Sequence, residues 1–242
     1  MCRKKDRIEL HAHTDKSNIR LLDSINHVED LIQTANDIGL LGVAITDHEF
    51  VGAHVKAIQA MRELKEKNKI NQDFKLILGN EIYLVESLEE VRDNYKSGVT
   101  KFPHYLLLSK NKEGHEALRK LSSQAWENSF YTGSMERVPT TMKDLKEMVE
   151  QYPDSLIATT ECLSSYTSIC ILEADKAHQE GDMERKKYHQ KNLINFIEWN
   201  IELHGKDNFF LELQPSADYE QMTVNNVLIK LSKKYDLKLI IT

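Results

Sequence analysis

The sequence predicts an α/β fold in which seven strand-helix alternations close into a TIM-like barrel, (βα)7. Two observations lead to this prediction. Apolar stretches alternate with amphipathic stretches of helical period along the whole chain. The apolar stretches are continuous, which is typical of parallel strands covered on both faces. No Gly/Ser/Pro-rich linker interrupts the alternation, so we expect one domain across residues 1–242.

The elements are expected in strict alternation. The first strand lies within residues 7–14, and the helix at residues 28–38 ends before Gly39. The later strands are expected at residues 41–46, 74–84, 104–108, 156–160, 209–213 and 237–242. The helices are expected at residues 55–69, within 87–100, at 113–128, 140–151, 183–204 and 224–235, with one more before 183. Thr140 or Thr141 is the expected N-cap of the helix at 140–151.

Composition narrows the class of protein. A net charge of -6 gives no overall basic field that attracts nucleic acid or an anionic membrane. The short basic runs at residues 65–69 and 185–187 are expected to be solvated helix faces. Three cysteines without zinc-finger or disulfide spacing suit a reducing cytoplasm. No signal pattern and no apolar run of about 20 residues is present, so we expect a soluble cytoplasmic protein without membrane contact.

His11 and His13 are separated by one residue in the first strand. Alternate side chains of an extended strand share a face, so the two imidazoles project to the same side. Such a pair can bind one metal ion or flank two. The alternative is a polar strand face with two solvated histidines, which is the commoner meaning of an isolated pair.

Further metal-binding residue types follow the next strands. Asp47 and His48 follow the second strand, Glu81 lies near the end of the third, and Cys162 follows the fifth. The carboxyl ends of parallel barrel strands meet at a common mouth, where active sites lie. Taken singly, these residues have ordinary alternatives as a helix cap, a surface acid or a small core residue. Their convergence predicts a multinuclear metal site.

The mixture of ligand types indicates the chemistry. Histidines with carboxylates suit zinc, manganese or iron, whereas an all-oxygen set suits magnesium or calcium. Clustered divalent ions can stabilise both the attacking and the leaving oxygen of a phosphoester. The sequence has no Walker-type glycine loop, no GxSxG and no GxGxxG motif. Metal-dependent phosphoester hydrolysis is therefore the favoured reaction.

Five stretches together carry a family resemblance. They are HAHT at 11–14, TDH at 46–48, GNEIYL at 79–84, HYLLLSKNKEGHEALRKLSSQA at 104–125 and FFLELQ at 209–214. The chain resembles the polymerase and histidinol phosphatase (PHP) domain, in the form found at the N-terminus of bacterial DNA polymerase III alpha subunits. The resemblance runs from about residue 7 to residue 242. It implies a distorted seven-stranded barrel with a trinuclear metal site.

The resemblance also implies a set of metal ligands. They are His11, His13, Asp23, His48, Glu81, His104 and Cys162. Glu81, His11 and His13 are the implied catalytic residues, with Glu81 bridging ions that the histidines fix. Asp23 is assigned from its RLLDS context, after a slightly longer segment at residues 18–20. His104 precedes YLLL and does not follow a strand, so its assignment rests on the resemblance alone.

The end of the sequence departs from the family pattern. The family carries an Asn-Asp-x-His motif after the last strand, and its Asp and His complete the metal site. This chain stops at Thr242, just before that motif. We therefore expect a single PHP domain, truncated at its C-terminal end, that retains fewer than three divalent ions (Zn, Mn or Fe). Glu81, His104 and Cys162 are expected to hold one of them.

Three functions are open. The leading prediction is metal-dependent phosphoester hydrolysis of the 3′-to-5′ exonuclease or proofreading type, by the PHP domain of a DNA polymerase III alpha-like protein in DNA replication. Its partners would be a DNA 3′ end or a small phosphoester and the other polymerase domains, and this fragment would be weakly active or inactive. The second is a metal-stabilised structural or docking module of the polymerase. The third, a free-standing histidinol-phosphatase-like enzyme, is disfavoured because residues 104–125 resemble the polymerase branch.

Overall fold

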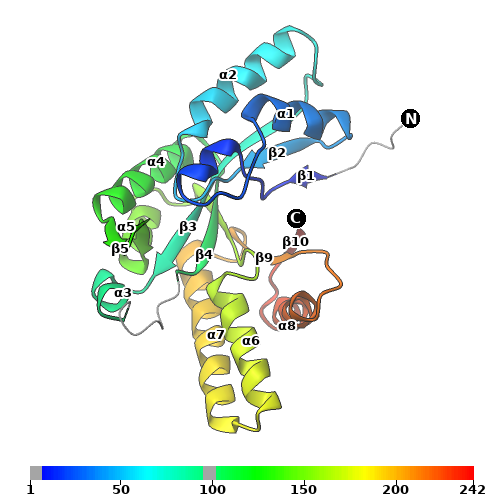
Figure 1. Ribbon diagram of the computed structural model, residues 1–242. Helices are drawn as coiled ribbons and strands as arrows, with labels where there is room; N and C mark the ends of the chain where they lie inside the picture. The colour runs from blue at the N-terminus through cyan, green and yellow to red at the C-terminus, as the bar shows by residue number, and fades with distance from the viewer. Residues whose placement is uncertain (1–6, 95–101) are drawn as a thin grey trace. The chain divides into compact units, whose positions relative to one another are not determined.

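The computed structural model describes residues 7–94 and 102–242 (Figure 1). Its contacts divide the chain into two compact units. The first unit comprises Met1–Tyr83 and Leu106–Thr140, and the second comprises Leu84–Tyr105 and Thr141–Thr242. The chain passes between the units within three strands, β3 (Lys75–Val85), β4 (His104–Ser109) and β7 (Pro139–Thr141).

Parallel strands form the centre of the first unit. Strand β2 (Gly42–Ile45) lies between β1 (Ile8–Glu9) and β3, with Ile8 opposite Gly42 and Gly42 opposite Lys75. All four residues of β2 are buried. This is the expected environment of a continuous apolar strand, because both faces of a parallel sheet are covered.

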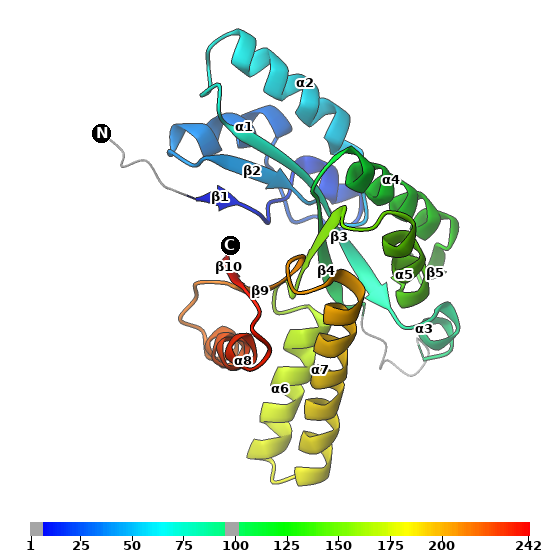
Figure 2. The same ribbon diagram turned by 180° about the vertical axis from the view of Figure 1, so that it is seen from behind.

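Helices α1 (Val28–Asp37) and α2 (Ala53–Glu66) pack against each other and against β2 (Figures 1 and 2). Ala53, Ala57, Ala60 and Leu64 recur at helical spacing on the buried face of α2. The small side chains of the three alanines let the helix axis approach the sheet closely. The other elements of this unit are the 3₁₀ helix η1 (Asp15–Ile19), α4 (Lys112–Glu127) and the antiparallel pair β5 (Phe130–Thr132) and β6 (Met135–Arg137).

The second unit has its own parallel strands. Strand β9 (Phe209–Leu213) lies between β8 (Leu156–Thr159) and β10 (Leu239–Ile241). The helices are α3 (Leu88–Asn94), α5 (Met142–Gln151), α6 (Tyr166–Gln179), α7 (Met183–His204) and α8 (Tyr219–Tyr235). Helices α6 and α7 lie side by side in both views (Figures 1 and 2). The short strand β7 (Pro139–Thr141) lies at the boundary of the two units and pairs with β3.

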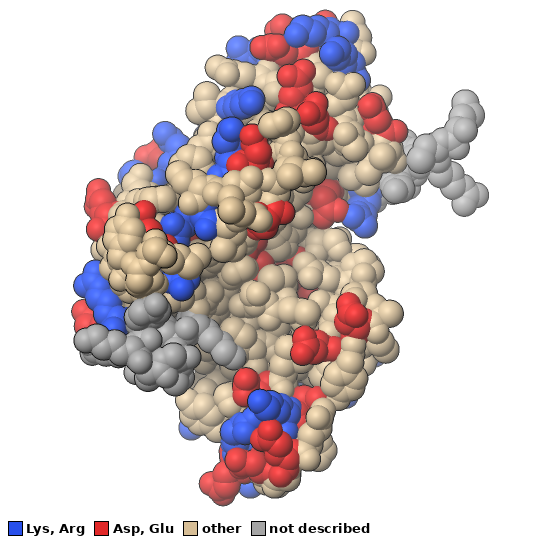
Figure 3. All heavy atoms as spheres, viewed as in Figure 1, with Lys and Arg blue, Asp and Glu red and all other residues tan. Residues whose placement is uncertain are grey.

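The charged runs lie on solvated helices. Residues 65–69 end α2 and the turn after it, and residues 185–187 lie near the start of α7. Figure 3 shows acidic and basic side chains intermixed over α2 and over the far end of the α6–α7 pair. Among the described residues, no helix has the length and apolar character needed to cross a membrane.

The predicted fold class is confirmed. The described residues contain seven strands in the order of an α/β sheet, β1-β2-β3-β4 and β8-β9-β10, with helices between them. Thr141 is the N-cap of α5 and forms a capping box with Asp144. The prediction of a single domain truncated before an Asn-Asp-x-His motif stays a prediction.

Some boundaries differ from those expected. Strand β1 ends at Glu9, so His11 and His13 follow the strand and do not lie in it. Strands β5, β6 and β7 fall in a region where no strand was expected, and α8 begins at Tyr219, before the expected residue 224. The expected helix within 87–100 ends at Asn94, and the remainder of that range up to residue 100 lies outside the described residues.

Gly79 gives a test of close packing beside the candidate site. A Cβ atom at this position would lie 2.7 Å from the Leu107 carbonyl oxygen and 2.8 Å from Thr46 Cγ2. We expect Gly79→Ala to lower the free energy of unfolding by about 1–3 kcal/mol, because backbone cannot yield as a flexible side chain can. Urea denaturation measures the change, with Ser123→Ala on the exposed face of α4 as control. Equal free energies of unfolding for the two variants would show that the structure accommodates the added methyl group without loss of stability.

Candidate metal centre

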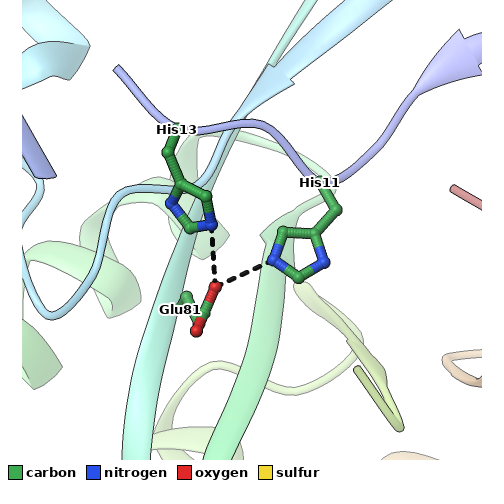
Figure 4. A group of neighbouring side chains, drawn as sticks. All are labelled: His11, His13 and Glu81. Carbon is green, nitrogen blue, oxygen red and sulfur yellow. Dashed lines mark hydrogen bonds and ion pairs between the residues drawn. The ribbon is translucent and has the colours of Figure 1, made fainter. Parts of the chain in front are cut away.

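Three imidazoles surround one buried carboxylate in the first unit. Figure 4 shows two of them, His11 and His13, beside Glu81. His11 Nε2 lies 2.8 Å and His13 Nε2 lies 3.1 Å from Glu81 Oε2. On the other oxygen, His48 Nδ1 lies 2.9 Å from Glu81 Oε1. The Glu81 side chain is only 1% exposed. We call His11, His13, His48 and Glu81 the Glu81 cluster.

The two N-terminal histidines are positioned by hydrogen bonds to the segment after β2. Ala12 and Thr46 exchange backbone and hydroxyl hydrogen bonds, with Thr46 N donating to Ala12 O at 2.9 Å and Ala12 N to Thr46 Oγ1 at 3.0 Å. Thr14 donates to Asp47 from its backbone N at 2.6 Å and from its hydroxyl at 2.8 Å. The segment around His13 is thus tied to the next strand even though β1 has ended.

Asp47 lies beside the Glu81 cluster and accepts hydrogen bonds from Thr14. Burial raises the pKa of Asp47 to about 6, while the hydrogen bonds from Thr14 and the nearby rings of His13 and His48 act in the opposite direction. Its carboxylate faces Thr14, and its backbone oxygen accepts from Asn80 Nδ2 at 2.7 Å. Asp47 therefore organises the segments that carry the ligands.

His48 links Glu81 to Asp23. Its Nε2 lies 2.7 Å from Asp23 Oδ2, and its ring stacks on that of His13 with centroids 4.4 Å apart. Asn18 fixes the loop that carries Asp23, since its side-chain oxygen accepts from Asp23 N at 3.2 Å. A carboxylate on the second nitrogen of a histidine fixes the orientation of the ring. Asp23 thus reaches the cluster through His48.

A second histidine pair supports the strand that carries Glu81. His54 Nε2 lies 2.9 Å from the Gly79 carbonyl oxygen, and its Nδ1 lies 3.1 Å from His115 Nε2. Burial lowers the pKa of His54 to about 4, and burial also lowers the pKa of His115. A neutral His54 ring then donates to Gly79 and accepts from His115. Sequence patterns did not single out this pair, because each histidine stands alone on its helix.

Cys162, His104 and Glu161 form another group, within the second unit. Cys162 Sγ lies 3.9 Å and Glu161 Oε1 lies 3.7 Å from His104 Nδ1. His104 is the first residue of β4, and the other two follow β8. Glu161 was not among the residues expected at the site. The only signal for it was an acid directly before Cys162 in the TTECL stretch.

Both groups have the chemistry of a metal site. His11, His13 and Glu81 offer ligand atoms within 4.8 Å of one another, and so do His104, Glu161 and Cys162. Imidazole with carboxylate suits zinc, manganese or iron, and the addition of a thiolate favours zinc or iron. The residues present therefore fit divalent ions. The structure brings five of the seven expected ligands together in the first unit and the other two together in the second, and their assignment as ligands stays a prediction.

The chain has an α/β fold with histidine and carboxylate groups that could hold metal ions, and comparison with known proteins identifies the family. The PHP domain family matches residues 9–216, so the chain belongs to the PHP domain family. A solved structure described as a "putative metal-dependent phosphoesterase" from Bifidobacterium adolescentis shares the fold, with a TM-score of 0.50 and 14% identity over 98% of this chain and 86% of that one.

Relatives among known proteins are DNA polymerases. The chain is 55% identical over 235 residues to probable DNA polymerase YorL of Bacillus subtilis (strain 168) and equally to a DNA-directed DNA polymerase of Bacillus phage SPbeta. It is 30% identical over 250 residues to the DNA polymerase III subunit alpha of Aquifex aeolicus. The matches cover 97% to 98% of this chain but only 18% of each relative.

The buried His54 gives the first unit a predicted acid sensitivity. Its pKa of about 4 in the folded protein lies below the ordinary 6.5, so the unfolded chain binds the proton more readily. The contribution of neutral His54 to the free energy of unfolding is complete above pH about 6.5. It is lost as the pH falls toward 4, and the total loss is about 3 kcal/mol at most. We expect His54→Gln to flatten this pH dependence.

The measurement uses the fluorescence of Trp126, which lies on α4 of the same unit, in a Trp199→Phe background. Urea denaturation is followed at a series of pH values between 4 and 7. The control is His178→Gln, at an exposed position on α6. Parallel pH profiles for the parent and His54→Gln would mean that His54 titrates equally in both states.

Proposed function

We propose that this chain is a metal-dependent phosphoesterase domain of a DNA polymerase III alpha-like protein, with 3′-to-5′ exonuclease activity on DNA ends. The observation that carries the proposal is the convergence of three imidazoles on the buried Glu81 carboxylate. The family and the DNA polymerase relatives support the replication context. The phosphoesterase reaction is supported by the donor set, because such ligands suit the divalent ions that hydrolyse phosphoesters.

The residues of the Glu81 cluster have distinct proposed roles. His11, His13, His48 and Glu81 would hold the ions, and Asp23 would orient His48 or join the ligands. When bound, divalent ions supply positive charge to the phosphoryl oxygens and make a water molecule more acidic. Both Glu81 oxygens contact imidazole nitrogens, which supports the proposal that Glu81 would help to hold more than one ion. His104 and Cys162 would hold a further ion in the second unit.

The partners follow from the relatives. Each is several times longer than this chain, so we propose that other polymerase domains accompany the PHP domain in the whole protein. The proposed substrate is a DNA 3′ end, and a small phosphoester is the alternative. A cytoplasmic location is part of the same proposal, because it follows the replication context.

A second function is favoured by the burial of the cluster. The side chains of Glu81 and His48 are 1% and 5% exposed, so an ion held there would join the segments after β1 and β2 to strand β3. Metal binding to the folded state alone stabilises it. A structural module of the polymerase would use the same residues without turning over a substrate.

Metal affinity tests the ligand assignment directly. We expect His13→Ala to weaken binding of Mn²⁺ and Zn²⁺ by more than about 10- to 100-fold, because removal of a ligand costs more than removal of its supporting partner. The fold should be retained, since His13 lies outside the apolar core. Isothermal titration calorimetry measures affinity and circular dichroism checks the fold. His27→Ala is the control, because that side chain is 65% exposed and its ring contacts Asp15, which lies outside the Glu81 cluster.

Hydrolysis separates the two functions. The parent protein is loaded with Mn²⁺ or Zn²⁺ and incubated with single-stranded DNA labelled at its 5′ end, and release of 3′ nucleotides is followed. We expect slow 3′-to-5′ shortening that Glu81→Gln abolishes. A parent protein that binds metal and gains thermal stability, yet shortens no DNA and hydrolyses no p-nitrophenyl phosphate ester, would support the structural function instead.

A further inference from the structure

Glu161 has an unusual backbone conformation. Its φ is +59°, in the left-handed region that glycine adopts freely and that a residue with a Cβ adopts at a cost. Its side chain is also fully buried, at 0% exposure. A carboxylate in such a place requires compensation of its charge. Strained backbone of this kind is found preferentially at functional sites.

The carboxylate of Glu161 points toward His104. Its Oε1 lies 3.7 Å from His104 Nδ1, and Cys162 Sγ lies 3.9 Å from the same nitrogen. Backbone hydrogen bonds fix both segments, with Glu161 N donating to Thr159 Oγ1 at 3.1 Å and His104 N donating to Ser164 O at 3.2 Å. Backbone hydrogen bonds thus position the two segments that bring these three side chains together.

These separations match the spacing of ligands around one ion. Hydrogen bonds between nitrogen and oxygen span about 2.7–3.2 Å, so 3.7 Å is too long for one. With ordinary zinc bond lengths, tetrahedral geometry places ligand atoms roughly 3.3–3.8 Å apart. The distances of 3.7 Å and 3.9 Å are close to that range. In the Glu81 cluster, by contrast, the contacts of 2.8–3.1 Å are hydrogen-bonding distances.

Hydrogen bonds also fix the position of Cys162. Ser164 N donates to its sulfur at 3.3 Å. Its backbone oxygen accepts from Ser165 N at 3.1 Å and from Ser168 Oγ at 2.9 Å, which places the residue beside the N-terminus of α6. The sulfur is therefore held in place before any ion binds.

We propose that Glu161 is a metal ligand and that it completes, with His104 and Cys162, a mixed nitrogen, oxygen and sulfur site for a zinc-type divalent ion. The inference rests on the proposed function for His104 and Cys162 and adds a third ligand to them. A thiolate and a carboxylate neutralise the double positive charge of the ion, and His104 supplies a neutral donor. The cost of the left-handed backbone and of the buried charge is thereby compensated when the ion is bound.

Cobalt(II) tests this site separately from the Glu81 cluster. Co²⁺ bound to a thiolate gives a charge-transfer band in the near ultraviolet, which Co²⁺ at the Glu81 cluster cannot give. The full chain carries Cys2→Ser and Cys170→Ser, so that Cys162 supplies the only thiol. Titration with Co²⁺, followed by competition with Zn²⁺, gives the affinity of the site that contains Cys162.

Two substitutions at Glu161 separate a ligand from a structural residue. Glu161→Gln keeps the shape and removes the charge, while Glu161→Gly removes the side chain and relieves the backbone strain. We expect both substitutions to weaken Co²⁺ binding at the thiolate site by more than about 10-fold. In other metal sites, loss of a residue that only supports a ligand already lowers affinity by about 10- to 100-fold. Glu161→Gly should also raise the thermal midpoint of the metal-free protein. Glu173→Gln on α6, which removes a surface carboxylate paired with Arg185, should leave the band and the affinity unchanged.

The outcomes distinguish the two levels of the proposal. If the parent shows the thiolate band and both Glu161 variants bind Co²⁺ as tightly with an unchanged spectrum, Glu161 is not a ligand and the inference is overturned. If the parent itself shows no thiolate band at any Co²⁺ concentration, Cys162 is not a ligand, and the part of the proposed function that assigns a metal to His104 and Cys162 fails.

Discussion

Burial of the Glu81 charge is the constraint on which the architecture of the first unit depends. An ionised carboxylate removed from water costs several kcal/mol unless opposite charges or hydrogen-bond donors replace the solvent. Here three imidazoles supply that replacement, and they come from segments that follow two different strands. The segments after β1 and β2 must therefore converge on β3.

The segments that carry the cluster are held together by hydrogen bonds from residues that do not contact the Glu81 carboxylate. Asp47 holds Thr14 with two hydrogen bonds, and Asn80 holds the backbone of Asp47. The His54 ring is hydrogen-bonded to the Gly79 carbonyl, two residues before Glu81. Side chains held by such a second layer of contacts lose little conformational freedom when an ion binds. The entropy cost of ordering them therefore reduces the binding free energy only slightly.

The two groups of candidate ligands differ in the spacing of their atoms. In the Glu81 cluster, imidazole nitrogens and carboxylate oxygens lie at hydrogen-bonding distances of 2.8–3.1 Å. At His104, Glu161 and Cys162 the atoms are farther apart, and backbone hydrogen bonds keep them there. That spacing leaves room for an ion between them.

The sequence by itself determined the α/β class and most of the ligand candidates. Continuous apolar stretches such as residues 42–45 can be stable only between two covering layers, so they specify parallel strands without tertiary information. The pair His11 and His13 and the residues after the second and third strands were visible as metal-binding types at strand ends. These features are local, because side-chain type and spacing within a few residues are enough to reveal them.

Only the tertiary structure decided which of these residues meet and through which atoms. The sequence could not show that β1 ends at Glu9, because hydrogen bonds to Thr46 and Asp47 carry His13 to its place after the strand stops. Nor could it single out Glu161, whose position depends on a left-handed turn after β8 lying against the start of β4. Contacts between segments more than 50 residues apart are set by strand pairing and burial, and no local pattern encodes them.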